Sequence, residues 1–296
     1  MWRIWAAALF WGLNWPIVKV LLTGVGPWTL RALGLNLGFV VLAATTLASG
    51  QSMAVPRAFW GRLFVAGMLN VACFSVFAVF AQMSMPASRA VILTYTMPLW
   101  SVVFARIMLG EKIDGLRAFA LVLGAAGVTV LSRPFWPELL AGRIPLALFY
   151  VMAAAITWAA GTVYMKRAQI PGAPMALTAW QILIGSAVSY IGLVLFETPR
   201  LELHRPEIAL TFAYHVFLPQ AAAYALWFGL VARVPASTAA LGTLLVPVFG
   251  VLGAIVLLGE RPPLLDLIGF GIIFTAVVAD QGVRTWRARP QVTASA

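Results

Sequence analysis

Charged side chains are scarce in this sequence of 296 residues. Asp, Glu, Lys and Arg together make up 10% of it, whereas hydrophobic residues make up 62%. A soluble domain is usually about a quarter charged and about half apolar. The composition therefore excludes an ordinary soluble domain and predicts a membrane protein.

Acidic residues are the rarer of the two charged kinds. The chain has nine Asp and Glu against 20 Lys and Arg, which gives a net charge of +11. In a soluble protein this excess would suggest a nucleic-acid partner. Here the basic residues lie between apolar runs, so we expect them to meet the headgroups of the lipid bilayer, and we expect no nucleic-acid partner.

Side chains that carry chemistry are also few. Cys73 is the single cysteine, which excludes an intramolecular disulfide, and the two histidines are His204, in a polar connection, and His215. There is no H-E-x-x-H motif and no pair of acids within an apolar run. We therefore expect no metal, no cofactor and no enzyme activity. A channel is disfavoured because no selectivity filter or charged ring is recognisable, and a scaffold would not account for the repeat described below.

Apolar runs long enough to cross a bilayer recur along the whole chain. A crossing takes about 20 residues, and short connections with Gly and Pro separate the runs. The runs lie at roughly 4–22, 29–48, 62–81, 88–108, 115–132, 145–165, 175–196, 208–230, 237–258 and 265–283. The sequence therefore predicts an all-α, multi-pass protein of the plasma membrane (the inner membrane in a bacterium) with ten transmembrane helices.

Lys and Arg are distributed unequally between the two sides of these spans. Twelve fall on the side that holds both termini and eight on the opposite side. Because cytoplasmic connections carry the excess of positive charge, we expect both termini in the cytoplasm.

One stretch of the sequence occurs twice. Residues 86–111 match residues 235–260 at eleven of 26 positions, and both copies begin with P-A-S, contain a proline and end with L-G-E. Self-similarity at a fixed offset indicates a duplicated unit, which divides the single membrane domain into repeats 1–134 and 135–296. Five spans in each repeat is an odd number, so the second repeat must enter the membrane from the opposite face. Such 5+5 inverted repeats recur in secondary transporters.

The repeated motif also resembles a known family. With Trp11-Gly12-x-Asn14 and Lys19 in the first span, it resembles the drug/metabolite transporter superfamily, in particular its ten-helix EamA-type branch. Within that branch the layout and the many tryptophans are similar to the YddG-type exporters. The resemblance implies export of small neutral solutes, above all aromatic and other neutral amino acids. Another metabolite or a drug is the alternative substrate, and the monomer is the expected functional unit.

Polar and aromatic residues deep within the spans indicate where a solute would bind, because polar groups in hydrocarbon normally face protein or water. Several lie three or four residues apart, on one face of a helix. Each has a structural alternative: the asparagines could link helices, and His215 could be a satisfied structural residue. The candidate substrate-binding residues are Trp11, Asn14, Asn70, Tyr95, Trp158, Thr162, His215, Gln220, Tyr224 and Trp227.

Two prolines lie at equivalent positions of the two repeats. Pro98 and Pro247 each remove a backbone hydrogen bond and are expected to kink a span, either as hinges of two gates or as static bends. Apart from Asp266 at the outer end of the last run, Asp280, close to the cytoplasmic end, is the only acid within a span. We therefore expect alternating access with facilitated movement through an aromatic-lined cavity, and proton coupling through His215 or Asp280 as the alternative.

Overall fold

The computed structural model describes residues 2–223, 226 and 244–287, and these are helical apart from short connections. One isolated bridge pairs Val25 with Leu201. The α-helices are α1 (Trp2–Leu21), α2 (Pro27–Ala48), α3 (Trp60–Gly67), α4 (Phe74–Ser84), α5 (Ala87–Thr94), α6 (Met97–Leu109), α7 (Gly115–Leu131), α8 (Trp136–Leu140), α9 (Leu146–Ala168), α10 (Pro174–Phe196), α11 (Pro206–Phe217), α14 (Leu245–Leu258) and α15 (Leu264–Arg287).

Several of these helices are long and apolar enough to cross a membrane. Five qualify within the described residues, and a sixth does if the bent pair of α7 with residues 133–140 is one span. Shorter apolar helices cover Trp5–Leu21 and Leu245–Leu258. The prediction of an all-α membrane protein is confirmed, whereas the number of ten spans and the side of the termini stay predictions.

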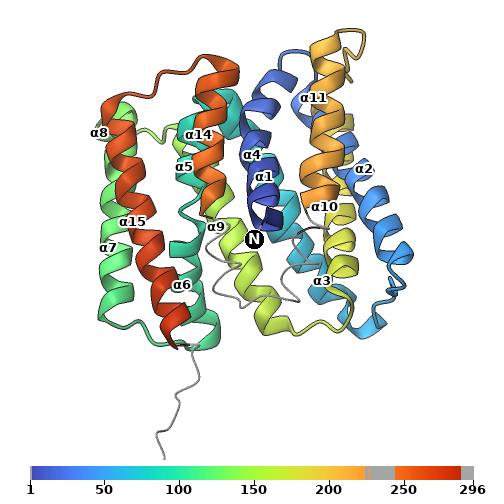
Figure 1. Cartoon of the computed structure of the whole chain (residues 1–296), viewed down its shortest axis with the longest axis horizontal. Helices are drawn as coiled ribbons and strands as arrows, with labels where there is room; N and C mark the ends of the chain where they lie inside the picture. Colours follow the sequence, from blue (N-terminus) through green and yellow to red (C-terminus); the bar gives the residue numbers. More distant parts are fainter. Residues whose placement is uncertain (1, 224–225, 227–243, 288–296) are drawn as a thin grey trace, which may run out of the picture.

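The helices lie side by side as a single bundle (Figure 1). α2 packs along α10, α7 along α15, and α1 along α14. The end uppermost in Figure 1, here called the upper face, carries the turn after α1 and the connections 197–205 and 259–263. The lower face carries the connections 49–56, 110–114 and 169–173. If the termini are cytoplasmic as predicted, the upper face is the outer one.

The third predicted span is not a uniform α-helix. Between α3 and α4 the backbone forms a π-helical segment at Met68–Cys73, and a second one follows α11 at Leu218–Ala222. These segments begin 150 residues apart (218 − 68), within one residue of the repeat offset. Such segments appear most often at functional sites. Met68–Cys73 contains neither Pro nor Gly, so nothing in its local sequence predicted it.

The kink predicted at Pro98 has a different origin. The fourth span consists of α5 and α6, and the break lies at Tyr95 and Thr96, before the proline. Pro98 is in the first turn of α6, where a missing N–H costs no internal helix bond. Pro247 is likewise in the first turn of α14.

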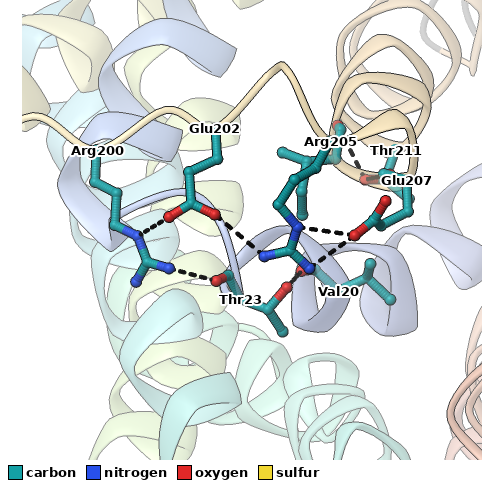
Figure 2. A network of polar contacts seen from close by, with 8 residues as sticks. Val20, Thr23, Arg200, Glu202, Arg205, Glu207 and Thr211 are labelled. Carbon is teal, nitrogen blue, oxygen red and sulfur yellow. Dashed lines mark hydrogen bonds and ion pairs between the residues drawn. The ribbon is translucent and has the colours of Figure 1, made fainter.

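The connection between α10 and α11 is hydrogen-bonded to the turn after α1 (Figure 2). The Gly26 N–H donates to the Arg200 carbonyl at 3.1 Å, and Arg200 Nη2 donates to the Thr23 carbonyl at 2.6 Å. Glu202 bridges Arg200 at 2.9 Å and Arg205 at 3.1 Å. The hydrogen bonds from these two guanidinium groups lower the pKa of the Glu202 carboxyl from its ordinary value. The carboxylate form, and with it this network, therefore persists to lower pH than an isolated glutamate would allow.

The repeated P-A-S and L-G-E motifs meet in the folded protein. Glu260, from the second L-G-E, accepts hydrogen bonds from Ala87 N at 2.7 Å, Ser88 N at 3.0 Å and Ser88 Oγ. These donors are the first backbone amides of α5, which have no partner within the helix. A carboxylate there also complements the helix dipole. The motif residue of one half thus caps a helix of the other half.

Removal of this cap should destabilise the protein. For Glu260→Ala we expect a loss of about 1–2 kcal/mol of unfolding free energy, because two amides and a hydroxyl lose their acceptor. The measurement is thermal unfolding of the purified protein in detergent. Glu138→Ala, at an exposed residue of α8, is the matched control. Equal unfolding temperatures for both variants would show that the cap contributes nothing.

Candidate functional site

A cavity of about 640 Å³ lies in the interior of the bundle. Its walls come from α1, α2, the segment Met68–Cys73, α4, α6, α9, α10 and the segment Leu218–Ala222. The site residues predicted from the sequence that line it are Trp11, Asn14, Asn70, Tyr95, Pro98, Trp158, Thr162 and Gln220. The structure therefore brings together, around one space, predicted site residues from five predicted spans.

Other predicted site residues do not line this cavity. Pro247 is buried and borders a small gap of about 10 Å³ that it shares with Tyr95. His215 lies behind the wall. Tyr224 and Trp227 lie outside the described residues.

Aromatic rings form much of the wall. The Phe74 and Trp158 rings pack with their centroids 4.7 Å apart and their planes inclined by 59°. Trp11 of α1 lines the same cavity, and its Nε1 donates to the Pro219 carbonyl at 3.1 Å. That carbonyl belongs to a π-helical segment, so the irregular backbone there supplies the acceptor that orients Trp11. The rings provide an apolar surface suited to a flat or branched side chain.

A pair of amides crosses the cavity wall between two spans. Asn70 Nδ2 donates to Gln181 Oε1 at 2.9 Å. Asn70 can approach α9 closely because Gly161 faces it, and a Cβ on Gly161 would lie 2.3 Å from Asn70 Oδ1. Gly161 therefore makes room for a cavity amide. Asn70 therefore links its span to α10 and also lines the cavity.

A second amide of the cavity wall, that of Asn14, contacts the buried His215. His215 Nδ1 lies 2.7 Å from Asn14 Oδ1, and the histidine side chain is 1% exposed. Gly34 of α2 permits this position, because a Cβ there would come within 2.9 Å of His215 Nε2. The structure thus places His215 against Asn14 and not on the wall, with its buried ring packed close to Gly34 of α2. Its contact with a solute would be indirect, through Asn14.

The sequence reasoning missed one charged residue of the wall. Arg31, in the second turn of α2, lines the cavity with a side chain only 6% exposed. A basic residue so close to the start of a span is normally an interface residue that indicates topology. The available signal was its spacing: Arg31, Gly34 and Gly38 share one helix face, and this face packs on His215 and Gln220.

The acid predicted within a span has a structural partner. Asp280 is fully buried, and its Oδ1 lies 3.8 Å from Arg117 Nε. It does not line the cavity. Among the described residues, no group of three or more His, Cys, Asp or Glu has the arrangement of a metal site.

A bundle of apolar helices around an aromatic and amide-lined cavity defines a membrane transporter. The chain belongs to the EamA-like transporter family, whose model matches residues 2–133 and 145–279. It is an integral, multi-pass membrane transporter and not an enzyme.

Similar proteins cover most of this chain. An uncharacterized transporter, YvbV, of Bacillus subtilis is 26% identical over 91% of this chain and 87% of its own length. A probable amino-acid metabolite efflux pump of Escherichia coli is 25% identical over 95% and 94%. The aromatic amino acid exporter YddG of Ancylobacter novellus is 28% identical over 58% and 60%.

The fold has been seen in a crystal structure as well. One solved chain, 23% identical in sequence, superposes with a TM-score of 0.67 over 97% of this chain and 98% of that chain. This likeness concerns the fold alone. The family match confirms the resemblance to EamA-type transporters drawn from the repeated motif.

Proposed function

We propose that this protein exports small neutral solutes, with aromatic and other neutral amino acids as the principal substrates. The observation that carries the proposal is the cavity of about 640 Å³, in which Trp11, Phe74 and Trp158 face neutral amides and hydroxyls. No acidic residue lines it among the described residues. Such a wall suits a solute with an apolar side chain and disfavours polycations, which need counter-charges. The names of the efflux pump and of the aromatic amino acid exporter agree with it.

We propose alternating access as the mechanism, carried out by a 5+5 inverted repeat with its halves at 1–134 and 135–296. Features that recur at the offset of 149 support it. Gly110 and Gly259 both end their helices in the left-handed region, with φ of 70° and 66°. Pro98 lies in the first turn of α6, and Pro247 lies in the first turn of α14. One proline-bearing helix in each half would gate one face of the membrane.

Reconstituted vesicles test the function. Vesicles preloaded with unlabelled phenylalanine should take up labelled phenylalanine in a saturable manner that the internal amino acid stimulates. Linear, non-saturating flux would instead indicate a channel. Absence of any amino-acid flux would contradict the proposed substrates and favour another metabolite.

Loss of an aromatic wall residue should weaken transport without unfolding the protein. For Trp158→Ala we expect a roughly tenfold lower uptake of phenylalanine at subsaturating concentration, because the ring that packs on Phe74 is removed. Trp136→Ala, in α8 with its side chain 42% exposed, is the matched control and should transport normally. Equal uptake by both variants would remove Trp158 from the proposed site.

A further inference from the structure

The cavity wall contains a buried guanidinium group, that of Arg31. Arg31 is 94% buried, lines the cavity, and its Nε atom has no hydrogen-bond partner among the described residues. No described residue forms an ion pair with it. Burial of an ionised group is costly unless it is paired and hydrogen-bonded, and arginine does not relieve that cost by losing its proton.

No acidic side chain of this protein is left to neutralise Arg31. All nine lie within the described residues, so the remaining positions contain none. Eight are engaged elsewhere and the ninth, Glu138, is exposed on α8. Their positions are as follows: Glu197 caps α2 through Trp28 N and Thr29 N, Glu260 caps α5, Asp114 caps α7, Asp266 pairs with Arg89, Asp280 with Arg117, Glu111 with Lys166, and Glu202 and Glu207 with Arg205.

The missing counter-charge points to the solute. We propose that Arg31 binds the carboxylate group of the transported molecule, an inference that rests on the function proposed above. The substrates would then be solutes with one carboxylate and an apolar side chain. A guanidinium group presents two parallel N–H donors that match a carboxylate. The aromatic rings of Trp11, Phe74 and Trp158 line the same cavity and supply the surface for the apolar part.

The other polar residues on the cavity wall are compatible with a carboxylate at Arg31 and an apolar side chain at the aromatic rings. Asn14 and Gln82, both on the wall, are neutral and add no charge that would compete with a carboxylate for Arg31. His215 holds Asn14 in place at 2.7 Å and is enclosed by α2. Arg31 is therefore the only cationic side chain on the cavity wall among the described residues.

Ligand-induced thermal stabilisation of the purified full chain tests the proposal. The probes are phenylalanine, phenylalaninamide, which lacks the carboxylate, 3-phenylpropanoate, which lacks the ammonium group, and sodium sulfate. Phenylalanine and 3-phenylpropanoate should raise the unfolding temperature of the unsubstituted protein, whereas phenylalaninamide should not. In Arg31→Gln the apparent affinity for both carboxylates should fall roughly 10- to 100-fold, which is the usual effect of a lost charged hydrogen bond.

A structural role for Arg31 predicts a different result. Since an unpaired buried charge is destabilising, ligand-free Arg31→Gln should unfold at the same or a higher temperature than the unsubstituted protein. A clearly lower temperature would overturn the proposal. Arg143→Gln, at an exposed residue after α8, is the matched control and should bind normally.

The remaining outcomes separate this proposal from the proposed function. Phenylalanine transport that is unchanged in Arg31→Gln would overturn the role of Arg31 and leave the function standing. Binding of 3-phenylpropanoate that depends on Arg31, without amino-acid transport, would support the carboxylate site and remove the amino-acid function. Equal stabilisation by sulfate, lost in Arg31→Gln, would identify an inorganic anion site and overturn the solute assignment. No stabilisation by any carboxylate would overturn it too.

Discussion

Gly12→Val is expected to yield no stably folded protein. At the crossing of α1 and α14, a Cβ on Gly12 would lie 2.6 Å from Phe249 Cβ and 2.7 Å from the Val246 carbonyl oxygen. Neither atom belongs to the free end of a flexible side chain, so the two helices would have to separate. Overpacking of this kind costs about 1–3 kcal/mol or more. The measurement is the yield of monodisperse protein after detergent extraction and gel filtration.

The control for this variant is a glycine with open space. Gly271 of α15 has no atom within 4 Å of its Cβ position, so Gly271→Val imposes the same β-branched side chain without the clash. Its yield should be close to that of the unsubstituted protein. A normal yield for Gly12→Val would mean that α1 and α14 do not pack as described. The same crossing gives the glycine of the W-G-x-N motif its physical meaning, since it lets α1 approach α14 closely.

Asp266→Ala is expected to be nearly as damaging. Arg89 and Asp266 form a two-fold pair, with Nε–Oδ2 at 3.0 Å and Nη2–Oδ1 at 3.1 Å, and their side chains are 11% and 8% exposed. The alanine variant leaves the Arg89 charge buried without its partner. Loss of one member of a buried pair costs about 3–5 kcal/mol. Thermal unfolding in detergent should show a large decrease, because the pair joins α5 to α15.

A double substitution distinguishes the lost pair from lost packing. Arg89→Met combined with Asp266→Leu removes both charges and keeps apolar volume, and it should recover most of the stability. Glu202→Ala breaks a solvent-exposed network and should leave the unfolding temperature nearly unchanged. If the double variant were as unstable as Asp266→Ala, the buried charge would not be the cause.

The membrane spans were predictable because hydrophobic length is a local property of the chain. Every described helix of span length overlaps a predicted apolar run. Most of the cavity was predictable too. Polar and aromatic residues are rare in such runs, so each one found there is a candidate to line a cavity. Trp11, Asn14, Asn70 and Trp158 were selected in this way and line one cavity.

The backbone irregularities were less predictable. Pro98 indicated the region of the break in the fourth span, but the break itself lies at Tyr95 and Thr96. The π-helical segment Met68–Cys73 carries no Pro or Gly, and its position depends on packing against α9 and α10. An irregular backbone that follows from tertiary contacts leaves no mark in the local sequence.

The sequence by itself determined that this is a membrane transporter of the EamA-like family with a repeated motif, few acids and a single cysteine. Only the tertiary structure decided that Arg31 turns inward, that His215 stands behind Asn14, and that Glu260 caps α5. The reason is the same in each case. A side chain's type and depth can be read along one helix, whereas the face that it presents is set by helices more than 150 residues away, such as α11 beside α2 and the end of α14 beside α5.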